Sequence, residues 1–262
     1  MDFCDVNQRF ENDSGVTDEG WLVDRLIKAS GVAMLSAPER LGDTWLAADL
    51  AVAAVTANDF LGHKTHLPPG SAVVIASGVQ SHRQVENRLS LLAKQRSGDL
   101  TGLYAAGLHL LCFANVPACP LDEGSSFRET VRALGRIGLI VLDGPPSQRN
   151  DDAWWAKLRV VQRETGAMVA VVSGFRAPPR RSSQKLAIER AVIDSLLLLR
   201  SSPGEPGRYE CFAIPDRSQN HSLDFSIRFS LGPDTAAFSE IENRRVRAAS
   251  DADVQAEVRS QS

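Results

Sequence analysis

The sequence predicts a three-layer α/β domain whose mainly parallel central sheet is followed by a C-terminal antiparallel extension. Short apolar runs bounded by Gly, Pro or Ser recur along the chain, and segments with helical periodicity lie between them. Runs that are apolar throughout are typical of parallel strands covered by helices on both faces. Two later runs alternate apolar and polar residues, which indicates a hairpin with one solvated face.

The predicted strands of the parallel part are the continuous apolar runs Val32–Ser36, Ala72–Ser77, His109–Ala114, Leu139–Asp143, Met168–Ser173 and Ser195–Arg200. The helical period is clearest after the first two runs, at Leu46, Leu50, Val85, Leu89 and Leu92. The alternating runs Tyr209–Ile214 and Asp224–Ser230 form the extension, and the Pro- and Gly-rich segment Ser201–Arg208 is predicted as the turn that leads into it.

Composition and charge exclude several classes of protein. Of the 262 residues, 43% are hydrophobic and 23% are charged, which is typical of an ordinary soluble protein and not of a disordered chain. No apolar stretch approaches the roughly 20 residues of a membrane span, and the acidic N-terminus has no apolar signal region. We therefore expect a cytoplasmic protein. The net charge of −3 excludes a strongly basic nucleic-acid coat protein but allows a local basic site.

The charge distribution suggests three regions. Residues 1–19 are predicted to be an acidic mobile lead-in, because they carry six acids and one base. Residues 20–236 form the α/β domain. Residues 237–262 mix both signs of charge, contain few large apolar residues and are predicted to be a helical tail with a frayed end. The four cysteines and five histidines have no metal-ligand spacing, so no metal site is predicted.

The loop after the first strand is a candidate phosphate-binding loop. A P-loop has the pattern GxxxxGK followed by Ser or Thr, between a strand and a helix. The segment that begins at Ala37 and contains Arg40 keeps the length, the second glycine (Gly42) and the hydroxyl residue (Thr44). It has Ala37 in place of the first glycine and Asp43 in place of the lysine. Taken alone, this segment fails the motif and is better interpreted as a plain strand-to-helix turn.

Four segments, the first of which contains this loop, carry a resemblance to one known protein family. They are Gly20–Gly62, Gly138–Asp143, Thr165–Ser173 and Arg181–Ser195. Together they resemble the RecA-like, RepA-type AAA ATPases, which include hexameric replicative helicases of plasmids and related mobile-element proteins. The resemblance covers roughly residues 20–232 and implies a RecA-like fold. It also implies a nucleotide site at Ala37, Arg40, Gly42, Asp43, Thr44 and Asp143, with Asp143 as the Walker B aspartate.

Two charges that the active members of this family need are missing. Asp43 stands where a lysine would contact the phosphates, and each pair of unit charges about 4 Å apart contributes about 4 kcal/mol at an effective dielectric constant near 20. The second predicted strand is not followed by the expected catalytic glutamate, because Glu86 comes about two helical turns too late. We therefore predict an inactive pseudo-ATPase without a cofactor, in which Asp43 substitutes for phosphate at a helix N-terminus.

An alternative is an active ATPase or helicase with an atypical site. It would bind ATP and Mg²⁺ and would use a lysine or arginine from a neighbouring subunit. A third interpretation is a regulatory subunit that binds an active paralogue without contacting DNA. For the inactive pseudo-ATPase predicted above, the resemblance implies a homo-oligomeric ring or filament that acts as a DNA-associated scaffold. Its role would be in replication, recombination or the maintenance of a mobile element.

A basic segment follows the fifth predicted strand, where the family's DNA-binding loop falls. Its candidate DNA-binding or intersubunit residues are Phe175, Arg176, Arg180, Arg181 and Lys185. Neutralisation of about four phosphates would give a log–log salt slope of roughly −3, and single-stranded DNA is the expected form. Phe175 could stack on a base. A solvated loop, or arginines that pair with a neighbouring subunit, are the alternatives.

Overall fold

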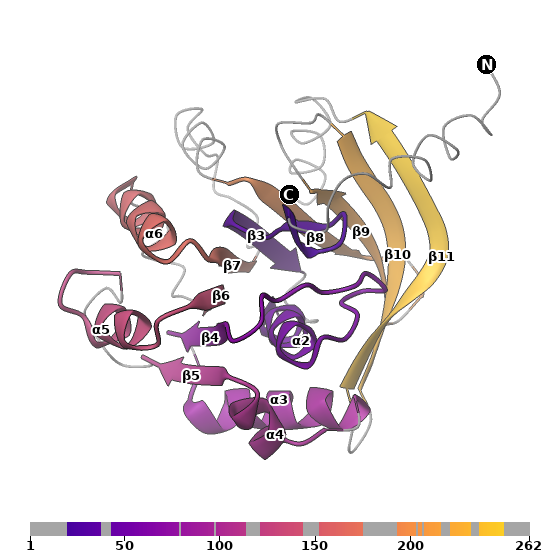
Figure 1. Cartoon of the computed structure of the whole chain (residues 1–262). Helices are drawn as coiled ribbons and strands as arrows, with labels where there is room; N and C mark the ends of the chain where they lie inside the picture. Colours follow the sequence, from indigo (N-terminus) through magenta and orange to yellow (C-terminus); the bar gives the residue numbers. More distant parts are fainter. Residues whose placement is uncertain are drawn as a thin grey trace.

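The described residues form a nine-stranded sheet with helices on both faces, and a separate two-stranded hairpin precedes it (Figure 1). The structure is a computed structural model. It describes residues 20–37, 43–78, 80–96, 98–113, 121–143, 152–174, 193–202, 204–205, 207–215, 221–231 and 236–248. The acidic lead-in predicted for residues 1–19 lies outside these ranges.

The parallel part of the sheet has the strand order β5-β4-β6-β7-β3-β8. Its strands are β3 (Gly31–Ala37), β4 (Ala72–Ser77), β5 (Leu108–Cys112), β6 (Ile137–Asp143), β7 (Met168–Gly174) and β8 (Ser195–Ser201). The antiparallel strands β9 (Arg208–Ile214), β10 (His221–Leu231) and β11 (Ala236–Ala248) continue the sheet beyond β8. The predicted fold class, a mainly parallel sheet with a C-terminal antiparallel extension, is therefore confirmed.

Helices on the two faces of the sheet bury alternate residues of the same strands. One face is covered by α2 (Asp43–Thr56), α3 (His82–Gln95) and α4 (Leu100–Ala105), and the other by α5 (Ser126–Ala133) and α6 (Asp152–Thr165) (Figure 1). In β3, Leu35 belongs to the core that contains α2, whereas Val32 belongs to the core that contains α6. None of the described helices has the length and apolar character needed to cross a membrane.

The prediction of a helical tail is wrong for residues 237–248. These residues belong to β11, which pairs with β10 from Ala236 opposite Leu231 to Ala248 opposite His221. The edge of β10 that β9 leaves open offers main-chain partners on both sides of an irregularity between Asp224 and Ser226. Phe238 packs on Phe229 of β10 with ring centroids 4.6 Å apart. Mixed charges are also common on edge strands, where they discourage further pairing. Residues 249–262 lie outside the described part of the chain.

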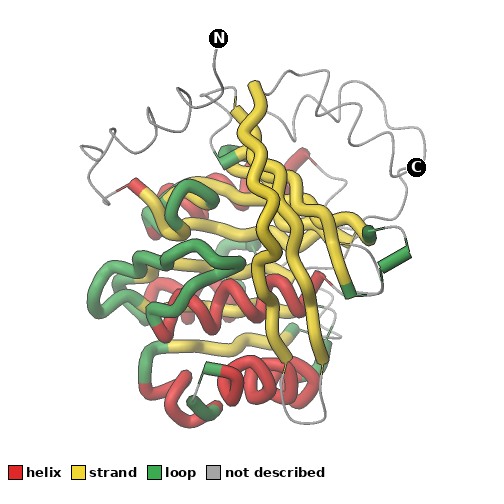
Figure 2. The backbone as a smooth tube through the Cα atoms, turned by 90° about the vertical axis from the view of Figure 1, so that its right-hand side faces the viewer, coloured by secondary structure: helices red, strands yellow, loops and turns green. Residues whose placement is uncertain are grey.

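The hairpin of β10 and β11 brings the extension close to the first helices. Figure 2 shows these long strands crossing one side of the molecule and reaching the level of the lowest helices. Residues of β11 contact α3, and Phe229 packs against Trp45 near the start of α2, with ring centroids 5.5 Å apart. The core that contains α2 and the antiparallel extension therefore pack against each other near the N-terminus of α2.

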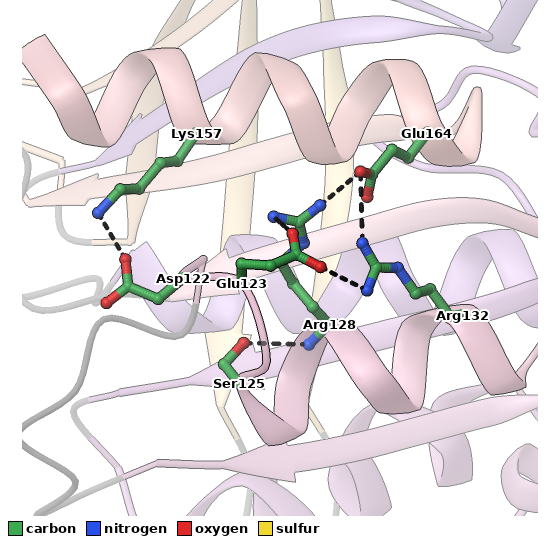
Figure 3. A network of polar contacts seen from close by, with 7 residues as sticks. All are labelled: Asp122, Glu123, Ser125, Arg128, Arg132, Lys157 and Glu164. Carbon is green, nitrogen blue, oxygen red and sulfur yellow. Dashed lines mark hydrogen bonds and ion pairs between the residues drawn. The ribbon is translucent and has the colours of Figure 1, made fainter.

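An ion-pair network on the opposite face explains how α5 carries a charged residue on its buried side (Figure 3). The side chain of Arg128 is only 7% exposed and pairs with both Glu123 and Glu164 of α6. Glu123 also pairs with the exposed Arg132 at 2.7 Å. A buried cation needs such partners, because an unpaired charge in the protein interior is strongly destabilising. The network joins α5 to α6, on the face of the sheet opposite to α2.

Figure 1 also shows the small hairpin of β1 (Trp21–Val23) and β2 (Ile27–Lys28), which the sequence did not predict. Its apolar residues Leu22, Leu26 and Ile27 are buried in the core that contains α2. The hairpin therefore closes one end of this core before the chain enters β3.

Candidate functional site

The candidate site lies where the carboxyl ends of β4 and β6 meet the first turn of α2. The last residues of the two strands, Ser77 and Asp143, are register partners in neighbouring strands. Thr44, the second residue of α2, reaches the same point, and all three side chains are buried. Ligands of open α/β sheets bind at this edge, because strand ends and helix N-termini converge there.

Asp143 is the acceptor at the centre of this group. Its Oδ2 accepts a hydrogen bond from Thr44 Oγ1 at 3.2 Å and another from Ser77 Oγ at 3.2 Å. The backbone N–H of Gly78 donates to the Asp143 carbonyl oxygen at 2.7 Å, which ties the end of β4 to the end of β6. Two residues of the predicted nucleotide site, Thr44 and Asp143, are therefore in direct contact.

Gln80 extends the group beyond the end of β4. Its backbone N–H donates to Ser77 Oγ at 3.2 Å, and its side-chain Nε2 donates to Thr44 Oγ1 at 2.8 Å. The Oε1 of the same amide accepts a hydrogen bond from Arg88 of α3. This glutamine therefore connects a cation to the hydroxyl group that begins α2.

The position of Arg88 follows from how α3 begins and which face it buries. Ser81 caps the helix, and its side chain and that of Gln84 form a capping box. Arg88 lies three residues after the buried Val85, on the side of the helix that faces the core. Its guanidinium carbon lies 5.4 Å from the centre of the Trp45 ring, within the range of a cation–π contact.

Arg88 and Asp143 carry opposite charges at the two ends of this chain of contacts. Burial lowers the pKa of Arg88 below its ordinary value, and the negative charge of Asp143 acts in the opposite direction. An arginine remains charged at neutral pH even after such a shift. Among the described side chains, a carboxylate and a guanidinium are therefore linked through Thr44 and Gln80.

The residues present do not fit the Mg²⁺ that the family resemblance implies. Mg²⁺ requires oxygen ligands, and in P-loop proteins the Ser or Thr hydroxyl and the Walker B aspartate hold it. Thr44 and Asp143 keep these oxygens. However, an N–H of Gln80 is directed at the Thr44 oxygen, and the Arg88 cation lies behind it. A hydrogen-bond donor and a second cation at this position both oppose binding of a metal ion.

Glu86, which comes too late in the sequence to be the catalytic glutamate of the family, has other partners in the structure. The hydroxyl of Tyr104 in α4 donates to Glu86 at 2.9 Å, and His82 lies 3.2 Å from it. The hydrogen bond from Tyr104 is the main reason why the pKa of Glu86 is lowered. This carboxylate is therefore held by the α3–α4 pair.

Several predicted site residues cannot be placed by their side chains. The backbone of Ala37 ends β3 and that of Asp43 begins α2, but their side chains lie outside the description, as do Arg40 and Gly42 entirely. The predicted DNA-binding residues Phe175, Arg176, Arg180, Arg181 and Lys185 also lie outside the described residues. Their predicted roles remain predictions.

Sequence reasoning missed four residues that the structure brings to this site: Trp45, Ser77, Gln80 and Arg88. Ser77 and Gln80 carried a usable signal, because they end and follow a buried strand, and such ends converge at the binding edge of a parallel sheet. Arg88 carried none, since it is one of several basic residues in an amphipathic helix.

Comparison with known proteins agrees with this architecture. A family model described as AAA domain matches residues 11–176, a range that includes β3, α2 and β6 with Asp143. No curated protein matches the chain. The family match spans more than half of the chain, and the mainly parallel sheet is that of a RecA-like P-loop domain. The chain therefore belongs to the AAA domain family of P-loop proteins.

Proposed function

We propose that this chain is a RecA-like pseudo-ATPase that acts in the cytoplasm as an oligomeric, DNA-associated scaffold. Its role would be in replication, recombination or the maintenance of a mobile element, as for RepA-type proteins. The observation that carries the proposal is the chain of contacts from Arg88 through Gln80 and Thr44 to Asp143, next to an aspartate at the lysine position of the P-loop.

The absence of hydrolysis follows from charge. A P-loop lysine attracts the β- and γ-phosphates, whereas Asp43 repels them if its carboxylate faces the same position. Gln80 follows β4, near the position at which active relatives have a catalytic glutamate, and an amide cannot accept a proton from the attacking water. Since its N–H also opposes a metal ion at Thr44, both substrate binding and catalysis are disfavoured.

The proposed role as a scaffold rests on the fold and on the basic segment after β7. RecA-like domains associate side by side, and this segment stands in the chain where the DNA-binding loop of the family falls. Its four basic residues are Arg176, Arg180, Arg181 and Lys185. Assembly without hydrolysis would make DNA binding independent of nucleotide. Size-exclusion chromatography with light scattering should therefore show the same oligomer with and without ATP, and a larger species with single-stranded DNA.

Reversing two charges in the basic segment tests the DNA contact. The Arg180→Glu/Arg181→Glu variant is expected to lose binding to single-stranded DNA, because two of about four phosphate contacts become repulsive. Fluorescence anisotropy with a labelled oligonucleotide at two salt concentrations measures the loss. Arg25→Glu/Arg163→Glu changes the net charge equally at two exposed residues and should retain binding. Unchanged affinity of the first variant would instead assign the segment to protein contacts, as expected of a regulatory subunit.

A further inference from the structure

The structure assigns to Arg88, acting through Gln80, the place that a metal ion takes beside Thr44 and Asp143 in related P-loop sites. The inference deepens the proposed function and rests on it, since a site with its own cation needs neither nucleotide nor metal to hold its shape. The residues concerned are on the core-facing side of α3, at the end of β4, in the first turn of α2 and at the end of β6.

The direction of each hydrogen bond in this chain follows from the arginine. A guanidinium can only donate, so the carbonyl oxygen of Gln80 must face Arg88 and its NH₂ group must face Thr44. The Thr44 oxygen accepts this N–H and directs its own proton to Asp143 Oδ2. Each hydrogen bond therefore has its donor on the side of Arg88 and its acceptor on the side of Asp143.

These hydrogen bonds matter energetically because Asp143 is buried. The side chain of Asp143 is buried, and a buried carboxylate is costly unless hydrogen bonds and an opposite charge compensate for it. Two hydroxyl groups supply the hydrogen bonds at 3.2 Å each. Arg88 supplies a positive charge, connected to Asp143 through Gln80 and Thr44. Burial lowers the pKa of Arg88, and the negative charge of Asp143 acts in the opposite direction. In an active site of this fold, Mg²⁺ would supply the positive charge.

The antiparallel extension holds Arg88 from the other side. Trp45 lies under the guanidinium, Phe229 of β10 packs on Trp45, and Phe238 of β11 packs on Phe229. The aromatic rings limit the directions in which Arg88 can turn and lower the local dielectric constant. The extension therefore supports the ring on which Arg88 packs.

Removing the cation should make the site dependent on Mg²⁺. We expect Arg88→Met to lower the Tm by several degrees, because the site loses the positive charge that is connected to the buried Asp143 through Gln80 and Thr44. The amide of Gln80 is then also free to turn its oxygen towards Thr44. Millimolar MgCl₂ should restore most of the lost Tm, since the side-chain oxygens of Gln80, Thr44 and Asp143 can then face a metal ion. The Tm of wild type should not change with MgCl₂. Arg83→Met, at an exposed position of the same helix, is the control and should show neither effect.

Metal binding supplies a readout that does not depend on thermal stability. Mn²⁺ titration followed by electron paramagnetic resonance should show affinity for the Gln80→Glu/Arg88→Met variant at least about tenfold higher than for wild type, because a second carboxylate replaces an amide and a cation is removed. Asn87→Asp adds a carboxylate at an exposed position of α3 and should bind like wild type. If Arg88→Met does not fold, this titration with wild type and Gln80→Glu still tests the inference, with wild type expected to bind more weakly.

The inference is overturned if wild type binds Mn²⁺ as tightly as these variants, or if Mg²⁺ raises the Tm of wild type and Arg88→Met equally. Both measurements use nucleotide-free, full-length protein. ATP turnover by wild type would contradict the proposed function, but the Mn²⁺ affinities and the effect of Mg²⁺ on the Tm would still test the inference. Failure of the inference and failure of the proposed function are therefore distinguishable.

Discussion

Replacing Gly31 with alanine is expected to lower the free energy of unfolding by about 2–4 kcal/mol, from backbone strain and the loss of a partly buried hydrogen bond. Gly31 begins β3 with a φ of +121°, and a Cβ atom there would lie 2.5 Å from Asp194 Oδ2. That oxygen accepts the Val32 N–H at 2.7 Å and pairs with Arg159 at 2.9 Å. The methyl group would displace the carboxylate from both partners. Chemical denaturation measures the change.

Gly166→Ala is the matched control for this prediction. Gly166 also has a positive φ, +67°, but nothing lies within 4 Å of the position of its Cβ atom. Its substitution is expected to cost only the strain of a left-handed alanine, about 1 kcal/mol. Combining Gly31→Ala with Asp194→Ala should cost less than the sum of the single variants, since the clash is then gone. Equal losses in Gly31→Ala and Gly166→Ala would show that the Asp194 contact is unimportant.

Acidification from pH 7 to pH 4.5 is expected to stabilise wild type by about 2 kcal/mol more than an Asp49→Asn variant. Asp49 is fully buried in α2, and burial raises its pKa from 3.8 to about 6, although Arg96 at 2.6 Å opposes the shift. The folded chain therefore binds a proton at a pH where the unfolded chain does not. Uptake of this proton favours the folded state, and the gain is lost again as the pH rises through about 6.

Urea denaturation at a series of pH values measures this difference. Other carboxylates titrate in the same range, so the informative quantity is the difference between wild type and Asp49→Asn at each pH. Asparagine keeps the size of the side chain and removes its charge. A difference that stays constant from pH 7 to pH 4.5, or that changes in the opposite direction, would show that Arg96 compensates Asp49 fully in the folded state.

The parallel strands were predictable because burial on both faces leaves a local signal. Every residue of β6, for example, is buried, and its sequence is an uninterrupted apolar run that ends in Asp143. The strand β11 was not predictable in this way. Its stability comes from pairing with β10, and its mixed charges resemble those of a solvated helix. The hairpin of β1 and β2 was also missed, because strands of three and two residues are too short to show a period.

The candidate site was predictable only where a motif carries it. Thr44 was found from the P-loop pattern and Asp143 from the resemblance to the Walker B strand of the family, and the two residues are in contact. Gln80 and Arg88 were missed, because their roles depend on how α3 lies against α2 and on the packing of Trp45 with the extension. Such contacts join segments that are distant in sequence, and no local pattern records them.

Titration of Mg²⁺ and ATP into the full-length wild-type protein, followed by calorimetry, tests the central claim most directly. The claim is that the P-loop of this AAA-family domain carries no working nucleotide site, because Asp43 replaces the lysine and Arg88 already balances Asp143. We predict no saturable heat of binding at micromolar to millimolar ATP, with or without Mg²⁺. Micromolar, Mg²⁺-dependent binding of ATP would contradict the account.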